Sequence, residues 1–490
     1  MGAAFLLAAL LAGALALAWM VAGRTRILFP LVLLYAALAY GVILTFVDGW
    51  APFAGGGDDS GYFLASQVRL SGAGWFDFNQ FPTFGQGGYP LMLAWVYQLT
   101  GASTYAYKAV NLFLYLLLAI LWFRIGDEMG GRRAGWAFAI GVLLGTPLWM
   151  YWMFILKDMT IVLLQSVFLL GAVRLAKGRG GLRTWVPIAV GTVLLIPFRV
   201  YLVILHAAVT VVTAVMAGRQ SGRRKATLLT GAAVLLGGLM YLGGNQATLT
   251  AFGAGGDKRS LDYETVRGVS EAYADQRSKF SGPVGTVIFP LAYVFGETSG
   301  LRIGGTGGGA VSGDIQRPVV MVGGLSALPW IFFGSPLLFY AVWHMLRRPV
   351  RRLLRQDRPP GWAMRAPRAV ILPAGGSSGW GREPGGTAVA VRPVVSAAAP
   401  AAVAPATVAA PAAESGVGGW LPLLVFLALY AVIAWLVEDT TRWRMPAFPV
   451  MTALAAQGWL WLRPRGRILI VGGWATSLAV LFTLYYGVLK

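Results

Sequence analysis

Long runs of apolar residues, separated by short polar or glycine-rich connections, repeat along almost the whole of this 490-residue chain. A helix needs about 20 predominantly apolar residues to cross a bilayer, and most of the runs approach that length with few internal charges. We therefore predict an all-α polytopic membrane protein with about 12 transmembrane helices. The predicted spans are residues 3–22, 27–47, 103–123, 134–153, 158–175, 184–198, 200–217, 226–243, 319–346, 420–437, 446–462 and 468–487.

Two further apolar segments, 89–99 (YPLMLAWVYQL) and 284–296, are too short to cross comfortably. We expect them to be interfacial or re-entrant helices. The first apolar run, 3–21, has no basic segment before it and no obvious small-residue cleavage site. We interpret it as a retained helix rather than a signal peptide.

Arginine and lysine are concentrated in every second connection between the predicted spans. These connections contain Arg24 and Arg26; Arg124, Arg132 and Arg133; Arg174, Lys177, Arg179 and Arg183; Arg219, Arg223, Arg224 and Lys225; Arg347, Arg348, Arg351, Arg352, Arg355 and Arg358; and Arg463, Arg465 and Arg467. The positive-inside rule assigns them to the cytoplasm, so the alternate connections face the exterior. The predicted external connections are 48–102, 154–157, the break near residue 199, 244–318 and 438–445.

Composition narrows the function classes. The net charge of +21 would be typical of a nucleic-acid-binding protein, but the arginines lie in short loops between apolar runs, as orientation signals do. We therefore exclude nucleic acid as a partner. The absence of cysteine excludes disulfides and thiolate chemistry. We assign no catalytic role to the two histidines and expect His206 to pack or hydrogen-bond in the interior.

Residues 347–419 differ from the rest of the chain. They begin Arg-rich, continue through Gly, Ser and Pro, and end in the tract AAAPAAVAPATVAAPAA. Because they lack the apolar periodicity of a core, we predict a disordered cytoplasmic linker. It separates a transmembrane module, residues 1–346, from further transmembrane helices of the same module, residues 420–490. Its arginines could bind anionic lipid head groups, although we favour a role as an orientation signal only.

Two adjacent carboxylates, Asp58 and Asp59, stand in the segment GDDSGY (57–62), shortly after an apolar span. In a closed site they cannot both ionise without a cation or donors nearby, so one is a candidate for a raised pKa and for proton chemistry. The alternative interpretation is a solvated turn, because Gly-Asp and Asp-Ser-Gly are ordinary turn sequences.

Further charges fall at the same predicted membrane face. Lys157 and Asp158 lie between two apolar runs, and Arg199 interrupts the segment LLIPFRVYLVIL. Charges at such positions are costly unless they meet water, a partner or a ligand. Four more charged residues follow the span that ends at 437: Glu438, Asp439, Arg442 and Arg444.

Each of these charges has a structural alternative. Lys157 could pair with its neighbour Asp158 or extend to the interface, and Arg199 could cap a helix C-terminus. Glu438 and Arg442 are four residues apart and could form a helical ion pair. Taken singly, we favour structural roles for Asp439 and Arg444, and functional roles for Asp58, Lys157 and Arg199.

Carboxylates and cations at the edge of a membrane suit a lipid-phosphate substrate. Lysine and arginine would hold the phosphate oxygens, and a carboxylate would take the proton from an attacking hydroxyl. Because the phosphate leaves with its lipid, these cations would stabilise charge that develops in the transition state. The hydrocarbon tail can remain in the bilayer.

An apolar span is followed by GDDSGY, then by GGYPLMLAWVYQLTG, and then by a helix that leads into RIGDEMGGRRAGWAFAIGVLLGTPLWMYWMFILKD. This order resembles the membrane-embedded GT-C glycosyltransferases, specifically bacterial members akin to family 39 and to the aminoarabinose and mannosyl transferases. The segment from Asp58 to Tyr62 is similar to their Asp-x-x-x-Tyr motif in the first external loop, whose Asp is the proposed catalytic base. Asp59 stands where many members have Glu.

Three shorter matches extend this resemblance. GYPLMLAW is similar to the family's Gly-Tyr-Pro-Leu/His-Pro-Pro segment, ILKD to a Lys-Glu or Ser-Glu step, and FRVY to an Arg-Pro-Tyr step. The resemblance covers residues 27–217 well and 420–450 more loosely. The chain departs from the family in lacking the large soluble C-terminal domain of some members, in the additional span 3–22 and in the insert 347–419.

The resemblance implies a GT-C-like fold with a structured first external loop, and sugar transfer from a polyprenyl-phosphate donor to a glycan, lipid or protein acceptor. The active site would face the exterior of a bacterial cytoplasmic membrane. Asp58 would be the base, supported by Asp59, while Lys157 and Arg199 would bind phosphate. The other candidate substrate-binding residues are Tyr62, Tyr201, Glu438, Arg442 and Arg444.

No cofactor is expected, and a divalent metal at Asp58 and Asp59 is an alternative that we do not favour. Two other functions stay open. One is a polysaccharide polymerase or ligase that uses a lipid-pyrophosphate-linked glycan. The other is a transporter or lipid flippase, which should show repeat symmetry with helices interrupted near the midplane. The sequence shows no convincing repeat.

Overall fold

The computed structural model describes residues 2–22, 27–50, 52, 57–67, 87–144, 153–179, 181–199, 202–217, 330–356, 417–437 and 445–488. The secondary structure in these residues is helical throughout, and they contain no strand. This confirms the predicted all-α class for the part of the chain that is described.

Five apolar helical segments within the described residues are long enough to cross a membrane: Phe5–Ala22, Leu28–Phe46, Thr104–Gly130, Asp158–Ala176 and Leu182–Arg199. Each coincides with a predicted span. These helices therefore fit a membrane protein. The total of 12 spans stays a prediction, and the segments 226–243 and 284–296 lie outside the described residues.

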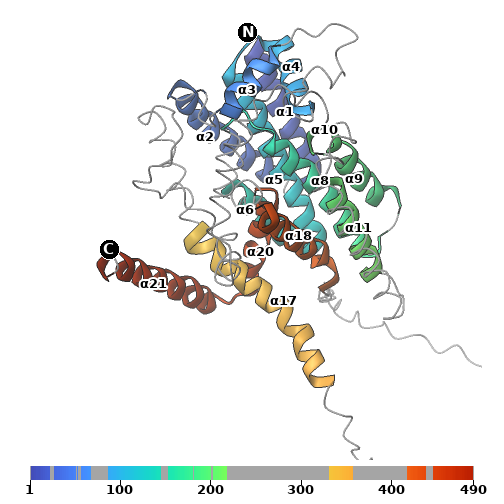
Figure 1. Cartoon of the computed structure of the whole chain (residues 1–490), viewed down its shortest axis with the longest axis vertical. Helices are drawn as coiled ribbons and strands as arrows, with labels where there is room; N and C mark the ends of the chain where they lie inside the picture. The colour runs from blue at the N-terminus through green and yellow to red at the C-terminus, as the bar shows by residue number, and fades with distance from the viewer. Residues whose placement is uncertain are drawn as a thin grey trace, which may run out of the picture. The chain divides into compact units, whose positions relative to one another are not determined.

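The long helices begin and end close to the predicted positions (Figure 1). They are α1 (Gly2–Ala22), α2 (Leu28–Trp50), α3 (Gly57–Ser66), α4 (Gly88–Thr100), α5 (Thr104–Gly130), α6 (Arg132–Leu144), α8 (Asp158–Ala176), α9 (Leu182–Val193), α10 (Ile196–Arg199), α11 (Leu202–Ala217), α17 (Ser335–Gln356), α18 (Leu421–Val437), α20 (Phe448–Trp461) and α21 (Pro464–Val488). Short π- or 3₁₀-helical turns are η8 (Trp330–Gly334), η9 (Val417–Trp420) and η10 (Met445–Ala447).

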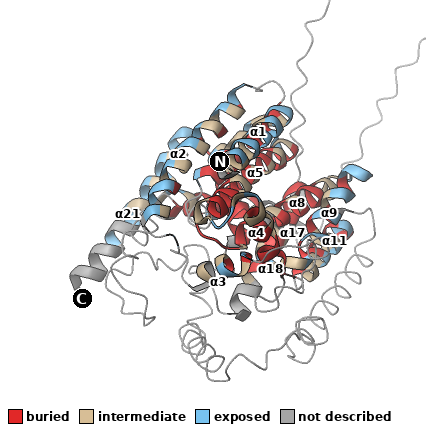
Figure 2. Cartoon of the chain, turned by 90° about the horizontal axis from the view of Figure 1, so that it is seen from above, coloured by how far each residue is buried: buried red, intermediate tan, exposed pale blue. Residues whose placement is uncertain are grey.

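The centre of the bundle is the pair α5 and α8. The first packs against α1, α2, α6 and α8, and the second against α9, α11 and α18. Figure 2 shows buried residues in the middle of the bundle, on α4, α5 and α8, and exposed residues on the outer helices α1 and α2. Glycines allow close approach: a Cβ added at Gly126 of α5 would lie 2.6 Å from the Ala134 carbonyl oxygen, and one added at Gly191 of α9 would lie 2.6 Å from that of Leu164. Small residues at such contacts are typical of helices packed in membranes.

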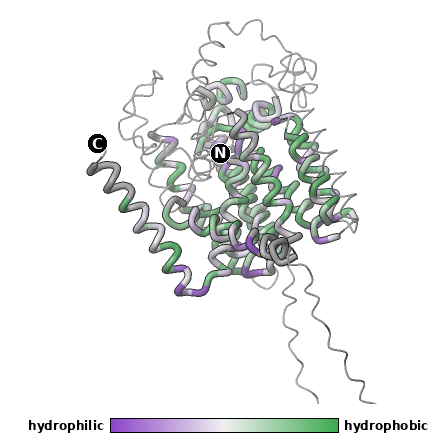
Figure 3. Tube along the Cα trace, turned by 60° about the horizontal axis from the view of Figure 1, so that its bottom comes forward, coloured by the Kyte–Doolittle hydropathy of each residue, from purple (hydrophilic) through white to green (hydrophobic). Residues whose placement is uncertain are grey.

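The contacts divide the chain into two compact units, one made of residues 1–345 and 415–490 and the other of Leu346–Glu414. In the first unit, the outer helices carry exposed apolar side chains, such as Phe5 and Tyr35. Figure 3 shows hydrophobic residues along most helices and hydrophilic ones near helix ends, including the turn between α20 and α21. This distribution is the one expected when lipid, rather than water, surrounds the middle of the bundle.

Three boundaries differ from the predictions. The helix α5 continues to Gly130, past the predicted end at residue 123, so Arg124 lies within the helix. The predicted span 184–198 is interrupted between α9 and α10, because Pro197 has no N–H to donate to the carbonyl of Val193. The helix α17 runs on to Gln356, so the first part of the predicted linker is helical. Apolar residues at helical spacing, Leu346, Val350 and Leu353, alternate with arginines there and favour an amphipathic helix. Residues 357–416 lie outside the described residues.

Candidate active site

The acidic motif forms the start of a short helix rather than an isolated turn. Asp58 and Asp59 lie in the first turn of α3, where the structure describes their backbone. Tyr62 follows one turn later and is only 3% exposed. Its ring packs edge-on against Tyr89 of α4, with the ring centroids 5.0 Å apart. The motif is thus anchored to α4 through its tyrosine.

The helix α4 connects α3 to the other elements at this end of the bundle. At the end of α3, the Ser66 hydroxyl donates a hydrogen bond to the Tyr107 hydroxyl of α5 at 2.8 Å. At the start of α4, Gly88 lies so close to α10 that an added Cβ would be 2.7 Å from the Pro197 carbonyl oxygen. The sequence places a glycine where these two backbones meet, which lets α10 pack against α4.

A buried ion pair joins α10 to α8. The Arg199 guanidinium donates to the Asp158 carboxylate, with 3.3 Å between Nη2 and Oδ1. Both side chains are almost fully buried. Lys157 immediately precedes Asp158 and is half-buried at the N-cap of α8. Lys157 was considered as a partner for Asp158 from the sequence, and the structure shows Arg199 in contact with this carboxylate.

Asn111 of α5 fixes the segment that carries Lys157. Its side-chain amide donates to the carbonyl of Phe154 at 2.6 Å, and it lies 3.4 Å from the Leu156 carbonyl and 3.2 Å from the Tyr89 hydroxyl. Asn111 is fully buried. It satisfies backbone groups that have no helical partner before α8 begins, so it holds this connection against α4 and α5.

A second ion pair closes the end of α2 onto α5. Lys108 is fully buried, and its Nζ lies 2.8 Å from Oδ1 of Asp48. The Thr104 hydroxyl donates to the other carboxylate oxygen at 3.1 Å. Asp48 ends α2 shortly before the acidic motif, so this contact fixes the point from which the chain leaves for α3. Residue 48 was predicted to begin the external connection 48–102, whereas Asp48 lies in the last turn of α2.

The opposite end of α5 carries a basic cluster. Glu128 accepts from Nε and Nη2 of Arg174 at 3.1 and 3.0 Å, and Arg124 lies 3.4 Å away. Arg179 also contacts this carboxylate, and Lys177 contacts the Glu128 carbonyl. Burial lowers the pKa of Lys177, and Arg179 lowers it further against the opposing effect of Glu128.

Lys108 and Glu128 are separated along α5 by about 30 Å, the thickness of a bilayer core. The arginines of two predicted basic connections thus lie together at the Glu128 end of α5. Five of the predicted site residues, Asp58, Asp59, Tyr62, Lys157 and Arg199, belong to elements that gather at the other end. The remaining four, Tyr201, Glu438, Arg442 and Arg444, lie outside the described residues, as does the predicted external connection 244–318.

Sequence reasoning did not single out Asn111, Tyr107, Lys108 and Glu128. The available signal was a polar residue inside an apolar helical run, which usually finds a partner on another helix. Among the described residues, no cluster of three histidine, aspartate or glutamate side chains could hold a metal ion. Comparisons with family models, with curated proteins and with solved structures found no match for this chain.

Proposed function

We propose that this protein is a membrane-embedded glycosyltransferase of the GT-C type. It would transfer a sugar from a polyprenyl-phosphate donor to an acceptor at the external face of a bacterial cytoplasmic membrane. The proposal rests on one observation above all: α3, which begins with the two aspartates, is connected through α4 to α10 and to the Asp158–Arg199 pair. This arrangement supports an acidic motif and cations that act at the same end of the bundle.

In the proposed reaction, the oxygen of an acceptor hydroxyl attacks the anomeric carbon of the donor sugar. The bond between that carbon and the phosphate oxygen breaks, and the lipid phosphate leaves with the electron pair. Asp58 takes the hydroxyl proton as a general base, with Asp59 beside it. Lys157 and Arg199 neutralise the charge that develops on the departing phosphate.

The ion pair suits this role for Arg199. A guanidinium has five N–H donors in a planar fork, so it can hold a carboxylate on one side and a phosphate on another. Asp158, itself buried, would fix the orientation of the fork before the donor binds. The remaining candidates, Tyr201, Glu438, Arg442 and Arg444, complete the proposed binding set on the basis of the sequence resemblance.

Purified full-length protein in lipid nanodiscs provides the test. A panel of radiolabelled polyprenyl-phosphate sugars is offered together with a bacterial membrane extract as the source of acceptor, with and without a divalent-metal chelator. We expect label to move from the lipid to an acceptor without added metal, and we expect Asp58→Asn to stop this transfer. Normal transfer by Asp58→Asn would refute the assignment of the base.

Two parallel reactions address the other functions. A lipid-pyrophosphate-linked glycan replaces the donor to detect a polymerase or ligase. Translocation of a fluorescent polyprenyl-phosphate lipid across vesicles, without acceptor, detects a flippase. Translocation that leaves the lipid chemically unchanged, together with no transfer to any acceptor, would overturn the glycosyltransferase proposal.

A further inference from the structure

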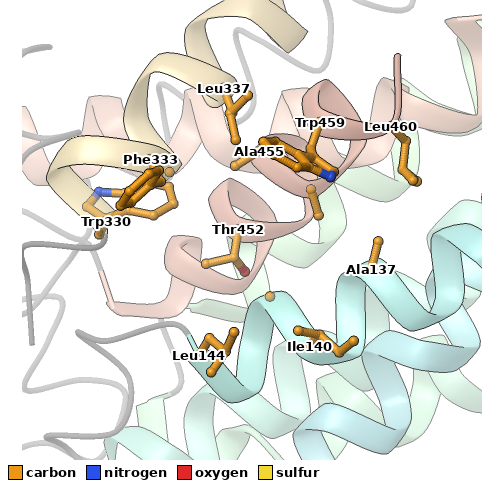
Figure 4. A pocket seen from close by; sticks show the side chains of 13 residues that line it. Ala137, Ile140, Leu144, Trp330, Phe333, Leu337, Thr452, Ala455, Trp459 and Leu460 are labelled. Atoms are coloured by element: carbon orange, nitrogen blue, oxygen red, sulfur yellow. The ribbon is translucent and has the colours of Figure 1, made fainter. Parts of the chain in front are cut away.

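An apolar cavity of about 570 Å³ lies between α6, α20 and the start of α17 with its preceding turn η8 (Figure 4). Its walls come from three parts of the chain far apart in sequence, residues 137–144, 330–337 and 452–460. None of the predicted active-site residues lines it. The cavity is therefore distinct from the site described above.

The walls of the cavity consist almost entirely of aliphatic and aromatic groups. Thr452 contributes a hydroxyl, which is already used in a 2.9 Å hydrogen bond to the Pro449 carbonyl. An ordered water needs two to four polar partners, so this cavity is unsuited to water. Leu144, Phe333 and Trp459 line it and are 67, 55 and 42% exposed. It thus opens toward the surroundings of the bundle, which are lipid in a membrane.

A cation marks one end of the cavity. The guanidinium carbon of Arg467 lies 4.4 Å from the ring centroid of Trp459, and Nε donates to the Trp459 carbonyl at 3.1 Å. No ion pair joins Arg467 to a carboxylate among the described residues. Arg467 lies in the first turn of α21 together with the exposed residue Arg465, and the exposed residue Arg463 immediately precedes this helix. Tryptophan and arginine together are typical of the head-group level of a membrane.

The length of the cavity fits one leaflet. From Thr452 to Leu460, α20 rises about 12 Å, and from Ala137 to Leu144, α6 rises about 10 Å. Half of a bilayer core is about 15 Å thick. A hydrocarbon chain that enters beside Trp459 would therefore run along α20 toward the middle of the membrane, while a charged head group stays at Arg467.

We propose that this cavity binds one acyl chain of an anionic phospholipid whose phosphate lies against Arg467. The positive-inside rule places the lipid in the cytoplasmic leaflet, at the end of the bundle away from the candidate active site. A bound phosphate would complete the charge pairing of a guanidinium that already stacks on the cavity wall. The inference does not depend on the proposed glycosyltransferase activity, since it uses none of the residues in that site.

The test uses the full-length protein in phosphatidylcholine nanodiscs containing a trace of phosphatidylglycerol that carries a photoreactive group near the end of one acyl chain. We expect labelled peptides from α6, α17 and α20, and we expect unlabelled phosphatidylglycerol to compete better than phosphatidylcholine. Arg467→Gln should weaken that competition about tenfold or more, the effect of losing one charge-assisted contact to a phosphate. Arg465→Gln is the matched control, because it removes the same charge from the same turn without removing that contact, and it should have a smaller effect.

A second pair of variants tests the cavity itself. Gly141 faces Thr452 and Ala456, with 3.5 Å as the nearest approach of an added Cβ, so the side chain of Gly141→Leu would occupy the hollow. Gly473→Leu on α21 is the control, since an added Cβ there meets nothing within 4 Å. Gly141→Leu should abolish labelling of α20, whereas Gly473→Leu should preserve it. Ala137→Leu enters the same cavity and replaces Gly141→Leu if that variant fails to fold.

Three results would overturn the proposal. The first is equal competition by phosphatidylcholine and phosphatidylglycerol. The second is an Arg467→Gln variant that behaves like Arg465→Gln. The third is labelling of α20 that persists in a folded cavity-filling variant, which would show that the acyl chain lies on the outer surface of the helices.

Discussion

Variants of the buried ion pair between Asp158 and Arg199 should change the stability of the protein and its affinity for the donor independently. The side chains of Asp158 and Arg199 are 1 and 7% exposed, so removing either side chain leaves the charge of the other buried and uncompensated. Such uncompensated charges typically cost about 3–5 kcal/mol. We place Arg199→Met and Asp158→Leu near the lower end of that range, because the 3.3 Å contact is long for a charge-assisted hydrogen bond.

The double variant distinguishes a structural from a substrate-binding arginine. Asp158→Leu with Arg199→Met removes both charges and should regain most of the stability that each single variant loses, since paired residues are non-additive. A charge-assisted contact to phosphate is worth about 1.5–3 kcal/mol, so donor affinity should fall about tenfold or more in Arg199→Met. It should remain low in the double variant even though the fold has recovered.

Thermal unfolding in detergent and equilibrium binding of a labelled polyprenyl-phosphate sugar measure these two quantities. The Asp48–Lys108 pair supplies the matched control, since it lies at the same end of the bundle and contains no predicted phosphate ligand. Neutralising both Asp48 and Lys108 should return the stability and the donor affinity together to near the values of the unsubstituted protein. Recovery of donor affinity in the Asp158–Arg199 double variant would show that Arg199 is purely structural. Additive losses of stability would show that the pair is not coupled.

Three further predictions concern other parts of the chain. Asp58→Asn should lower the transfer rate by about a hundredfold to ten-thousandfold and leave donor binding nearly intact; an unchanged rate would remove Asp58 from the mechanism. Gly88→Ala should lower the melting temperature because its Cβ would lie 2.7 Å from the Pro197 carbonyl oxygen, whereas Gly41→Ala, with nothing within 4 Å, should not; equal melting temperatures would contradict the close contact. Replacing residues 360–415 with a short flexible linker should preserve transfer, and a folded but inactive product would identify this segment as a docking element.

The apolar periodicity predicted the helices well because it depends on local sequence alone. The predicted spans 3–22 and 158–175 match α1 and α8 almost residue for residue. His206, assigned to the interior, is buried and stacks on Phe168. The extension of α17 was not predicted, because its last turns contain many arginines and few apolar residues, which hides the helical spacing of those apolar residues.

The contacts within the candidate site could not be predicted in the same way. Arg199 meets Asp158 across 41 positions of sequence, and Asn111 meets Phe154 across 43. Spacing along one helix reveals partners three or four residues away, but it carries no information about which helices pack together. The sequence could indicate only that a buried charge needs a partner, and the fold decides which one it receives.

The central helix α5 is fastened to its surroundings at both ends. Near its start Lys108 is paired with Asp48, and near its finish Glu128 is held by Arg174. Sliding α5 by a single turn, about 5.4 Å, would separate both pairs at once. Any rearrangement that admits a substrate should therefore leave α5 stationary and move other elements around it. In hydrogen exchange, its amides should be among the slowest in the protein and should keep the same rates when a ligand binds.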